Sequence, residues 1–319
     1  MAFSKSAQTD PDQKRPRNVM KVTLEEKDRG KRLRDYLRTN LKLSGRNIKR
    51  LAMDRQIYIG RKSVQLDYMI KGDEILHLNL DRDESQDMEK VKMDLAIIYE
   101  DSSLIVINKP PHLVVHPTRN HKADTLTNGL LYHFFETGDP AIVRLVSRLD
   151  MNTSGLVLIA KNQFVHSSFA RYKGDDQSVK TYLGITPGIW EPKKGTIDAP
   201  ILWPDPDDYR RVVDELGQPS RTHYEVVSEF NDFCLVRFIL ETGRTHQIRV
   251  HSKYMGHPLV GDELYGGLLS GDDPRQFLHA YKLEFTHPMT RERISLKAPL
   301  PDDMQEFIKN HGAIWQELE

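Results

Sequence analysis

A single carboxylate, Asp150, stands in a run of turn-forming residues directly before an apolar segment. The run Arg148-Leu149-Asp150-Met151-Asn152-Thr153-Ser154-Gly155 is followed by Leu156-Val157-Leu158-Ile159-Ala160. Asn, Thr, Ser and Gly favour turns, and an unbroken apolar segment predicts a strand that is buried on both faces. The sequence therefore places a carboxylate on a tight loop at the end of a core strand. There it could act as a base or a nucleophile, or form a structural ion pair that caps the turn.

Two later stretches carry groups that could line the same site. Residues 178–185 alternate as a strand does, and Tyr182 falls on the face opposite Leu183 and Ile185. This separates Tyr182 from the predicted core, although a half-buried surface tyrosine is the ordinary alternative. Residues 245–251 follow a turn at 241–244, and we predict that they are helical and carry Arg249.

These stretches resemble the signature motifs of the RluA-type pseudouridine synthases, the large-subunit ribosomal RNA pseudouridine synthase family. The matching segments are Arg148-Leu149-Asp150-x-x-Thr153-Ser154-Gly155, Lys180-x-Tyr182, Thr245-His246-Gln247-Ile248-Arg249-Val250-His251, Gly261-Asp262-x-x-Tyr265-Gly266 and Leu278-His279-Ala280. The family pattern begins with His where this chain has Ser147. Because that position lies outside the carboxylate, we expect the chemistry to be retained, and a different RNA target is one interpretation of the change.

The resemblance implies roles for individual residues. Asp150 would be the catalytic residue, Arg249 its partner, and Tyr182 the ring that stacks on the target base. Arg148 would occupy the space that the base leaves when it flips out of its stack, with a structural ion pair as the alternative. The residues predicted to contact the substrate are Arg148, Thr153, Lys180, Arg244, His246 and Gln247.

Conversion of uridine to pseudouridine breaks the glycosidic bond, turns the uracil and rejoins it through carbon five. The reaction needs neither redox chemistry nor outside energy, so we expect no cofactor and no metal. Asp150 could attack the ribose or deprotonate it, and the sequence leaves both roles open. A nearby Arg249 would keep the carboxylate ionised, because an opposite charge lowers an Asp pKa by about 1–3 units, and a fork from Arg249 would fix its direction.

Other function classes fit the sequence less well. A metal hydrolase is suggested by His246 and His251, but their i, i+5 spacing puts them on different faces of a helix. A dinucleotide or nucleotide enzyme would need a Gly-x-Gly-x-x-Gly or Gly-Lys-Ser/Thr element. A non-catalytic RNA-binding protein would explain the N-terminal region alone, but not the three motifs that follow it.

The N-terminal region is basic, although the net charge of the whole chain is zero. Residues 1–80 hold 19 Lys/Arg and 10 Asp/Glu, a net charge of +9, so the remainder carries −9. We predict two amphipathic helices here, the second capped by Ser44, followed by a small sheet. This pattern resembles the RNA-binding domain named after small-subunit ribosomal protein four. The predicted RNA contacts are Arg32, Arg34, Arg46, Lys49 and Arg50, with an ordinary solvated helix face as the alternative.

The overall prediction is an α+β protein whose catalytic domain has a mixed, largely antiparallel sheet. Residues 1–17 would be a disordered tail, 18–80 the RNA-binding domain, 81–92 a linker and 93–319 the catalytic domain, with a weakly structured loop over 186–221. One cysteine in 319 residues and no long apolar run favour a monomeric cytoplasmic protein without a membrane segment. The expected substrate is ribosomal RNA, with transfer RNA as the alternative.

Overall fold

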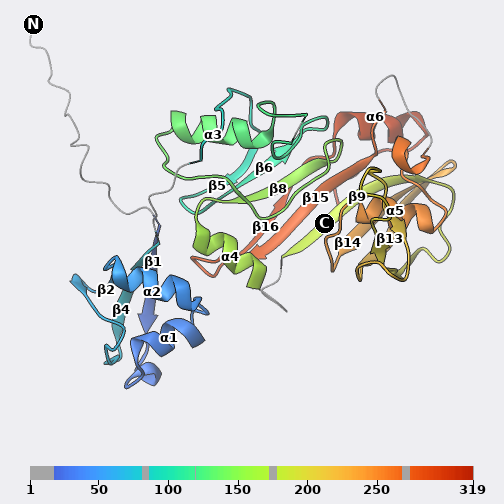
Figure 1. The fold of residues 1–319 in the computed structure, drawn as a ribbon. Helices are drawn as coiled ribbons and strands as arrows, with labels where there is room; N and C mark the ends of the chain where they lie inside the picture. Colours follow the sequence, from blue (N-terminus) through green and yellow to red (C-terminus); the bar gives the residue numbers. More distant parts are fainter. Residues whose placement is uncertain (1–17, 81–85, 119, 172–177, 268–273, 319) are drawn as a thin grey trace, which may run out of the picture. The chain divides into compact units, whose positions relative to one another are not determined.

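The computed structural model describes residues 18–80, 86–118, 120–171, 178–267 and 274–318. The chain divides into two compact units, Met1–Asp83 and Glu84–Glu319 (Figure 1). The predicted disordered tail over 1–17 lies outside the described residues, as does the part of the predicted linker over 81–85. None of the helices in the described ranges has the length and apolar character that a bilayer crossing requires.

The first unit packs two helices on a small antiparallel sheet. Its elements are β1 (Val19–Leu24), η1 (Glu26–Asp28), α1 (Leu33–Thr39), α2 (Gly45–Met53), β2 (Ile57–Ile59), β3 (Lys62–Ser63) and β4 (Glu74–Asn79), with strand order β1-β4-β2-β3. Ser44 caps α2, as predicted: its hydroxyl accepts a hydrogen bond from the Asn47 N–H at 3.2 Å. The helices bury Leu37 and Leu51 completely, so their basic residues take the other faces.

The second unit is built on one large sheet. Its strands are β5 (Ile97–Glu100), β6 (Leu104–Lys109), β7 (Arg144–Leu145), β8 (Ser154–Ala160), β9 (Val179–Pro187), β10 (Lys194–Asp198), β13 (Arg221–Phe230), β14 (Phe233–Leu240), β15 (Leu278–Thr286) and β16 (Arg293–Lys297). The order is β10-β13-β14-β9-β15-β8-β6-β5, with β16 on β15 and β7 on β8. Among the described strands of this sheet, β8 and β15 alone run parallel. The predicted mixed, largely antiparallel α+β fold is confirmed.

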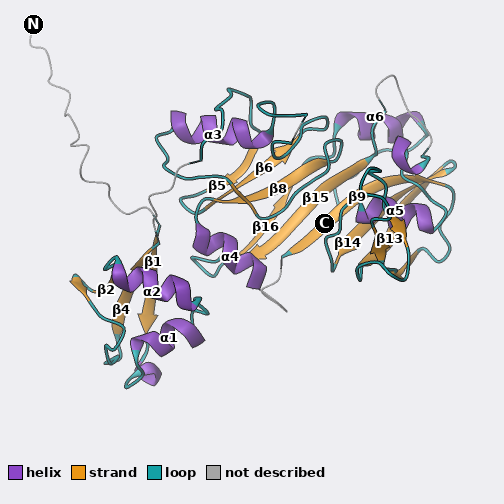
Figure 2. Ribbon diagram, in the orientation of Figure 1, coloured by secondary structure: helices purple, strands orange, loops and turns teal. Residues whose placement is uncertain are grey.

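Helices cover the large sheet at both ends (Figure 2). They are α3 (Leu126–Glu136), α4 (Gln163–Arg171), α5 (Gln247–Tyr254) and α6 (Asp302–Asn310), together with the short turn η3 (Glu263–Tyr265). Every residue of β8 is buried, as its unbroken apolar run predicts. Neighbouring residues of β9 enter different core clusters: Tyr182 packs in one, and Leu183 and Ile185 pack in another. Both faces of the sheet are therefore covered.

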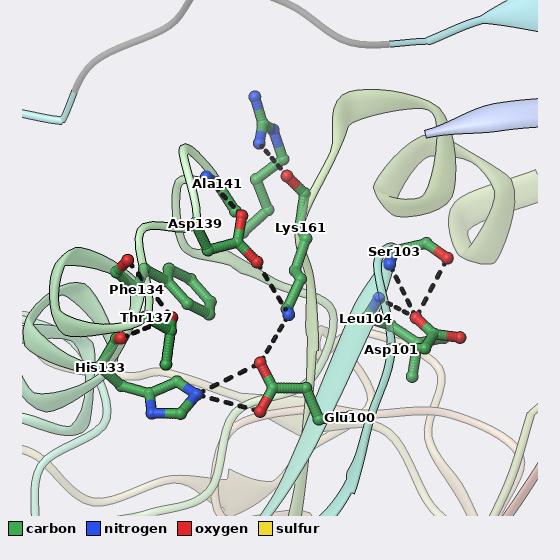
Figure 3. Close-up of polar contacts among 11 residues, drawn as sticks. Glu100, Asp101, Ser103, Leu104, His133, Phe134, Thr137, Asp139, Ala141 and Lys161 are labelled. Atoms are coloured by element: carbon green, nitrogen blue, oxygen red, sulfur yellow. Dashed lines mark hydrogen bonds and ion pairs between the residues drawn. The ribbon is translucent and has the colours of Figure 1, made fainter. Parts of the chain in front are cut away.

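An ion-pair cluster around the buried Lys161 fixes the far end of β8 (Figure 3). The Lys161 ammonium, 3% exposed, lies 2.6 Å from a Glu100 carboxylate oxygen and 3.1 Å from one of Asp139. His133 reaches the same Glu100 at 3.0 Å, and the Phe134 ring lies 5.2 Å from the ammonium. Because a buried charge is stable only when it is paired, this cluster ties the end of β8 to β5 and to α3.

Two expectations about the connections differ from the structure. Residues 186–221 form β10, β11 (Ile201–Leu202) and β12 (Val212–Val213) where we expected a weakly structured loop, because β10 pairs with β13 and Trp190 is buried. The linker predicted over 81–92 extends too far. The Gln86 side chain accepts a hydrogen bond from the Val143 N–H at 2.9 Å, so this end belongs to the second unit.

Candidate active site

Asp150 lies on the loop that leads into β8. The Ser147 hydroxyl accepts a hydrogen bond from the Leu158 N–H at 3.1 Å, which fixes the start of this loop against the strand it precedes. Gly155 has φ +108°, and a Cβ there would meet the Ala280 carbonyl oxygen at 2.4 Å. Only glycine fits that position, so the Thr-Ser-Gly ending of the motif serves the close approach of β8 to β15.

Arg249, on α5, connects two carboxylates. Its Nη1 lies 3.2 Å from Asp150 Oδ2. Its Nε lies 2.8 Å from Asp262 Oδ2, and its Nη2 lies 2.8 Å from Asp262 Oδ1. The prediction that Arg249 is the partner of Asp150 agrees with this geometry. The predicted bidentate hydrogen bonding of Arg249 to Asp150, which we called a fork, is wrong. The fork goes to the fully buried Asp262. Burial opposes the charge on Arg249, yet the two carboxylates more than offset it and raise its pKa.

A pocket opens beside the Asp150 carboxylate. Its lining brings together Arg148, Leu149, Asp150, Thr153, Tyr182, Leu240, Arg244, His246, Gln247, Ile248, Arg249 and Leu278. The Asp150 side chain is 29% exposed, so a bound molecule could reach it. The walls combine apolar side chains with one carboxylate and several cations, which suits a flat, partly apolar group attached to a polyanion.

Tyr182 lines this pocket but is more deeply buried than its sequence suggests. It is 7% exposed and packs in the same core cluster as Phe238 and Leu278. The prediction that Tyr182 stands apart from the core is therefore wrong, because the sheet is covered on both faces. Burial, aided by the nearby Asp150 charge, raises the pKa of the phenol far above its ordinary value, so the hydroxyl stays neutral.

His246 faces Asp150 from the turn before α5. Its Nε2 lies 3.8 Å from Asp150 Oδ2, and its Nδ1 lies 2.9 Å from the Tyr265 hydroxyl. Burial lowers the pKa of His246. His251 is directed elsewhere: its two ring nitrogens contact the Thr222 hydroxyl at 2.8 Å and the Ala199 carbonyl at 2.9 Å. Within the described ranges, no three His, Cys, Asp or Glu side chains are placed to hold a metal ion.

The four residues after Asp150 are held by side chains from β6, from β15 and from the segment that enters β15, two through their carbonyls and two through their hydroxyls. The Lys109 ammonium donates to the Met151 carbonyl at 2.8 Å, and Arg275 donates to the Asn152 carbonyl at 3.3 Å. Gln276 donates to the Thr153 hydroxyl at 3.1 Å, and His279 Nδ1 lies 2.9 Å from the Ser154 hydroxyl. Four consecutive residues of the loop are thus fixed.

Two of the predicted substrate contacts differ in their setting from the others. The Gln247 amide is fully engaged: its oxygen accepts from Thr242 and from the Arg244 N–H, and its nitrogen donates to the Arg221 carbonyl and to Thr222. An amide has no further capacity, so Gln247 closes the turn before α5. Lys180, two residues before Tyr182, does not line the pocket. By contrast, Arg148 and Arg244 line it with exposed side chains.

In the first unit, the predicted RNA contacts lie on or beside the two helices. Arg32, Arg34, Arg46 and Lys49 are exposed. Arg50 is half-buried and lies 3.6 Å from the Asp54 carboxylate, so it is the least available of the five. The alternation of these residues with Leu33, Leu37, Ile48 and Leu51 leaves one face of each helix basic.

Sequence reasoning missed several residues that hold the site. Asp262, Tyr265 and His279 lie in segments whose resemblance to the family was clear, but nothing in their spacing shows what they contact. Lys109 is the last residue of its strand and precedes two prolines, a pattern typical of an exposed turn, although its side chain is buried. Arg275 lies three residues before the start of β15 and carries no periodic signal.

Comparison with known proteins agrees with the motifs. A family model described as RNA pseudouridylate synthase matches residues 103–254. The chain is 37% identical over 297 residues to the Bacillus subtilis protein named uncharacterized RNA pseudouridine synthase YlyB, across 92% of this chain and 98% of that protein. It is also 37% identical over 297 residues to the ribosomal large subunit pseudouridine synthase D of Buchnera aphidicola, across 87% and 91%. A human structure titled RNA Pseudouridylate Synthase Domain Containing 4 superposes with a TM-score of 0.54 at 27% identity, covering 65% of this chain and 89% of that one.

Proposed function

Because the chain belongs to the RNA pseudouridylate synthase family, we propose that it isomerises specific uridines of large-subunit ribosomal RNA, with Asp150 as the catalytic carboxylate. One observation carries the assignment of Asp150. Its carboxylate faces the pocket, and the buried Arg249 contacts it through Oδ2 at 3.2 Å. This contact supplies a compensating positive charge, while the other oxygen is not used by Arg249.

The reaction conserves atoms and electrons. The bond from N1 to C1′ breaks, a bond from C5 to C1′ forms, the C5 hydrogen leaves as a proton, and N1 gains a proton. Asp150 can attack C1′ and hold the ribose as an ester while the uracil turns, or it can take a proton from C2′. Both routes use the carboxylate as an anion, and the Arg249 guanidinium lies 3.2 Å from it.

The remaining lining residues suit a flipped uridine. Leu240, Ile248 and Leu278 offer apolar contacts, and the Tyr182 ring offers a surface for stacking, which contributes roughly 1–3 kcal/mol per base. Removing a base from its stack costs a few kcal/mol. Arg148 is exposed beside Asp150, which supports its proposed role of occupying the vacated position in the RNA.

The choice of ribosomal RNA rests on the relatives. A protein named as a large-subunit ribosomal pseudouridine synthase shares 37% of its residues with this chain over most of both lengths. The exposed basic residues of the first unit, Arg32, Arg34, Arg46 and Lys49, would contact phosphates of that RNA. Mapping pseudouridine in ribosomal and transfer RNA from cells with and without the gene tests the choice, and loss of sites in transfer RNA alone would replace the proposal.

The catalytic role of Asp150 is tested with Asp150→Asn. We expect tritium release from RNA labelled at uracil C5 to be abolished, while RNA affinity stays within severalfold, because phosphate contacts supply most of the affinity. Asp139→Asn is the matched control: it also neutralises an aspartate of the second unit that pairs with a cation, but Asp139 does not line the pocket. Substantial turnover by Asp150→Asn would disprove the assignment.

A further inference from the structure

The short turn η3 contacts both groups that face Asp150. Asp262, which caps the turn, accepts two hydrogen bonds of 2.8 Å from Arg249. Tyr265, its last residue, places its hydroxyl 2.9 Å from Nδ1 of His246. Residues 262–265 therefore touch the cation and the imidazole that lie nearest to the proposed catalytic carboxylate.

Asp262 determines how the Arg249 guanidinium is shared. It is fully buried, and it takes the Nε and Nη2 edge, leaving Nη1 for Asp150 at 3.2 Å. A guanidinium that faces a single carboxylate commonly forms two parallel bonds with it. Without Asp262, the fork of Arg249 would be available to both oxygens of Asp150. Asp262 thus limits the contact between Arg249 and Asp150 to one oxygen, Oδ2.

Tyr265 fixes the orientation of the His246 ring. The Tyr265 hydroxyl accepts a hydrogen bond from the Arg211 N–H at 2.9 Å, so its own proton is available to Nδ1 of His246. An imidazole that accepts this bond at Nδ1 carries its proton on Nε2, the nitrogen that lies 3.8 Å from Asp150 Oδ2. His246 also has φ +58° and ψ +18°, a left-handed backbone that is uncommon outside glycine. Tyr265 of η3 therefore contacts a histidine whose backbone is already constrained.

The turn itself has little room to move. A Cβ on Gly261 would lie 1.9 Å from the Arg275 carbonyl oxygen, and one on Gly267 would lie 1.9 Å from the Leu259 carbonyl oxygen. Val260 donates to the Ile185 carbonyl at 2.9 Å and accepts from Phe277 at 2.8 Å. These contacts join the turn to the end of β9 and to the segment that enters β15, so its two side chains start from a fixed backbone.

We propose that Asp262 and Tyr265 are positioning residues for the isomerisation. Asp262 acts through Arg249 and Tyr265 acts through His246, and together they present Asp150 with one guanidinium N–H and one imidazole N–H. The inference rests on the proposed catalytic role of Asp150. The alternative is a buried ion pair that only stabilises the fold, in which case its loss would lower stability without a specific loss of turnover.

The first experiment is a double-mutant cycle on turnover. Tritium release from one RNA is measured for wild type, Asp262→Asn, Arg249→Gln and the double variant, with Asp139→Asn as the control for loss of a buried ion pair. We expect kcat of Asp262→Asn to fall about 10²-fold through misorientation, with KM within about threefold. The double variant should be about as slow as Arg249→Gln, because the two shortest hydrogen bonds of the Asp262 carboxylate go to that guanidinium.

A second cycle does not depend on the folding of Asp262→Asn. Tyr265→Phe removes one oxygen and keeps the ring that lies 5.0 Å from Arg249. It is combined with His246→Asn, because Asn tolerates a left-handed backbone. We expect Tyr265→Phe to lower kcat and to have no further effect once His246 is replaced.

The outcomes distinguish failure of the positioning role from failure of the proposed function. Wild-type kcat in folded Asp262→Asn, or losses that multiply in either cycle, would overturn the positioning role and leave the proposed function intact. Asp139→Asn should have a lowered melting temperature with wild-type kcat, and a similar loss of kcat there would mean that instability explains the result. If Asp150→Asn retains turnover, the proposed function fails first and the inference fails with it.

Discussion

Replacement of Arg249 by Lys tests whether the site needs a positive charge or a guanidinium. Arg249 uses three nitrogens: Nη1 contacts Asp150 at 3.2 Å, while Nε and Nη2 contact Asp262 at 2.8 Å. A lysine ammonium is a single nitrogen on a flexible chain. It can pair with one of the two carboxylates, but it cannot occupy the three positions at once.

The size of the effect follows from the contacts that are lost. Hydrogen bonds that involve a charged group contribute about 1.5–3 kcal/mol each. Two of the three contacts disappear in Arg249→Lys, so we expect the free energy of unfolding to fall by about 3–5 kcal/mol, the range seen when a buried pair loses a partner. Misplacement of the Asp150 carboxylate, the proposed catalytic group, should lower kcat about 10²-fold, while KM changes little.

The assay combines urea unfolding with turnover at a temperature where the variant remains folded. The comparison variant is Arg237→Lys, which changes an arginine that lies 3.1 Å from the Glu225 carboxylate, a pair with both side chains at least 33% exposed. That variant should lose less than about 1 kcal/mol and keep its activity. If Arg249→Lys keeps near wild-type kcat, the guanidinium plane is not what orients Asp150, and Arg244 becomes the next arginine to consider.

Three further predictions concern RNA binding, the base and pH. Removal of residues 1–80 takes away a net charge of +9 and should flatten the salt dependence of RNA affinity while kcat at saturation survives; equal salt slopes would place the phosphate contacts on the second unit. Tyr182→Leu should lose more turnover than Tyr182→Phe, because the proposed role of the ring is to stack on the base; equal losses would refute stacking. Lys109→Met should change the pH dependence of stability, which is measured by urea unfolding from pH 6 to pH 10.

Local patterns predicted the parts of the fold that depend on neighbours in the sequence. The apolar run 156–160 became a fully buried strand, and Ser44 caps α2. Both outcomes depend on side chains within a few residues of each other. Burial along strand β1 alternates between neighbouring residues, with Met20 and Leu24 buried.

The rest depends on contacts between distant segments. Tyr182 looks like a surface residue by alternation, but β14 and β15 flank its strand, and the opposite face of the sheet is covered too. Arg249 was predicted to face Asp150, yet the preference of its fork for Asp262 follows from how η3 folds back onto α5. β10 forms only because it pairs with β13 in register. No periodicity within one segment encodes these pairings.

The loop that carries Asp150 is held through the Met151 and Asn152 carbonyls and the Thr153 hydroxyl. The contacts of the carboxylate with Arg249 and His246 converge on Oδ2. Lys109 is central to this loop. It is completely buried and donates to the carbonyls of Pro110 at 2.7 Å and Met151 at 2.8 Å. Burial, reinforced by the Arg275 charge and opposed by that of Asp150, lowers the pKa of Lys109 from 10.5 to about 7. A rigid backbone beneath a lightly held carboxylate suits a group that must form and release bonds.

The lowered pKa of Lys109 has a definite consequence for stability. Between pH 7 and pH 10.5 the unfolded chain holds a proton on this lysine that the folded chain has released, so the wild-type free energy of unfolding rises with pH. Below pH 7 both states are charged and the folded state bears the full cost of the buried ammonium. At ~1.4 kcal/mol per pH unit the change is about 5 kcal/mol at most. The stability of Lys109→Met relative to wild type should therefore fall by up to this amount as the pH rises. Parallel stability curves would mean that the two carbonyls keep Lys109 charged throughout, so that it clamps the Asp150 loop as a cation.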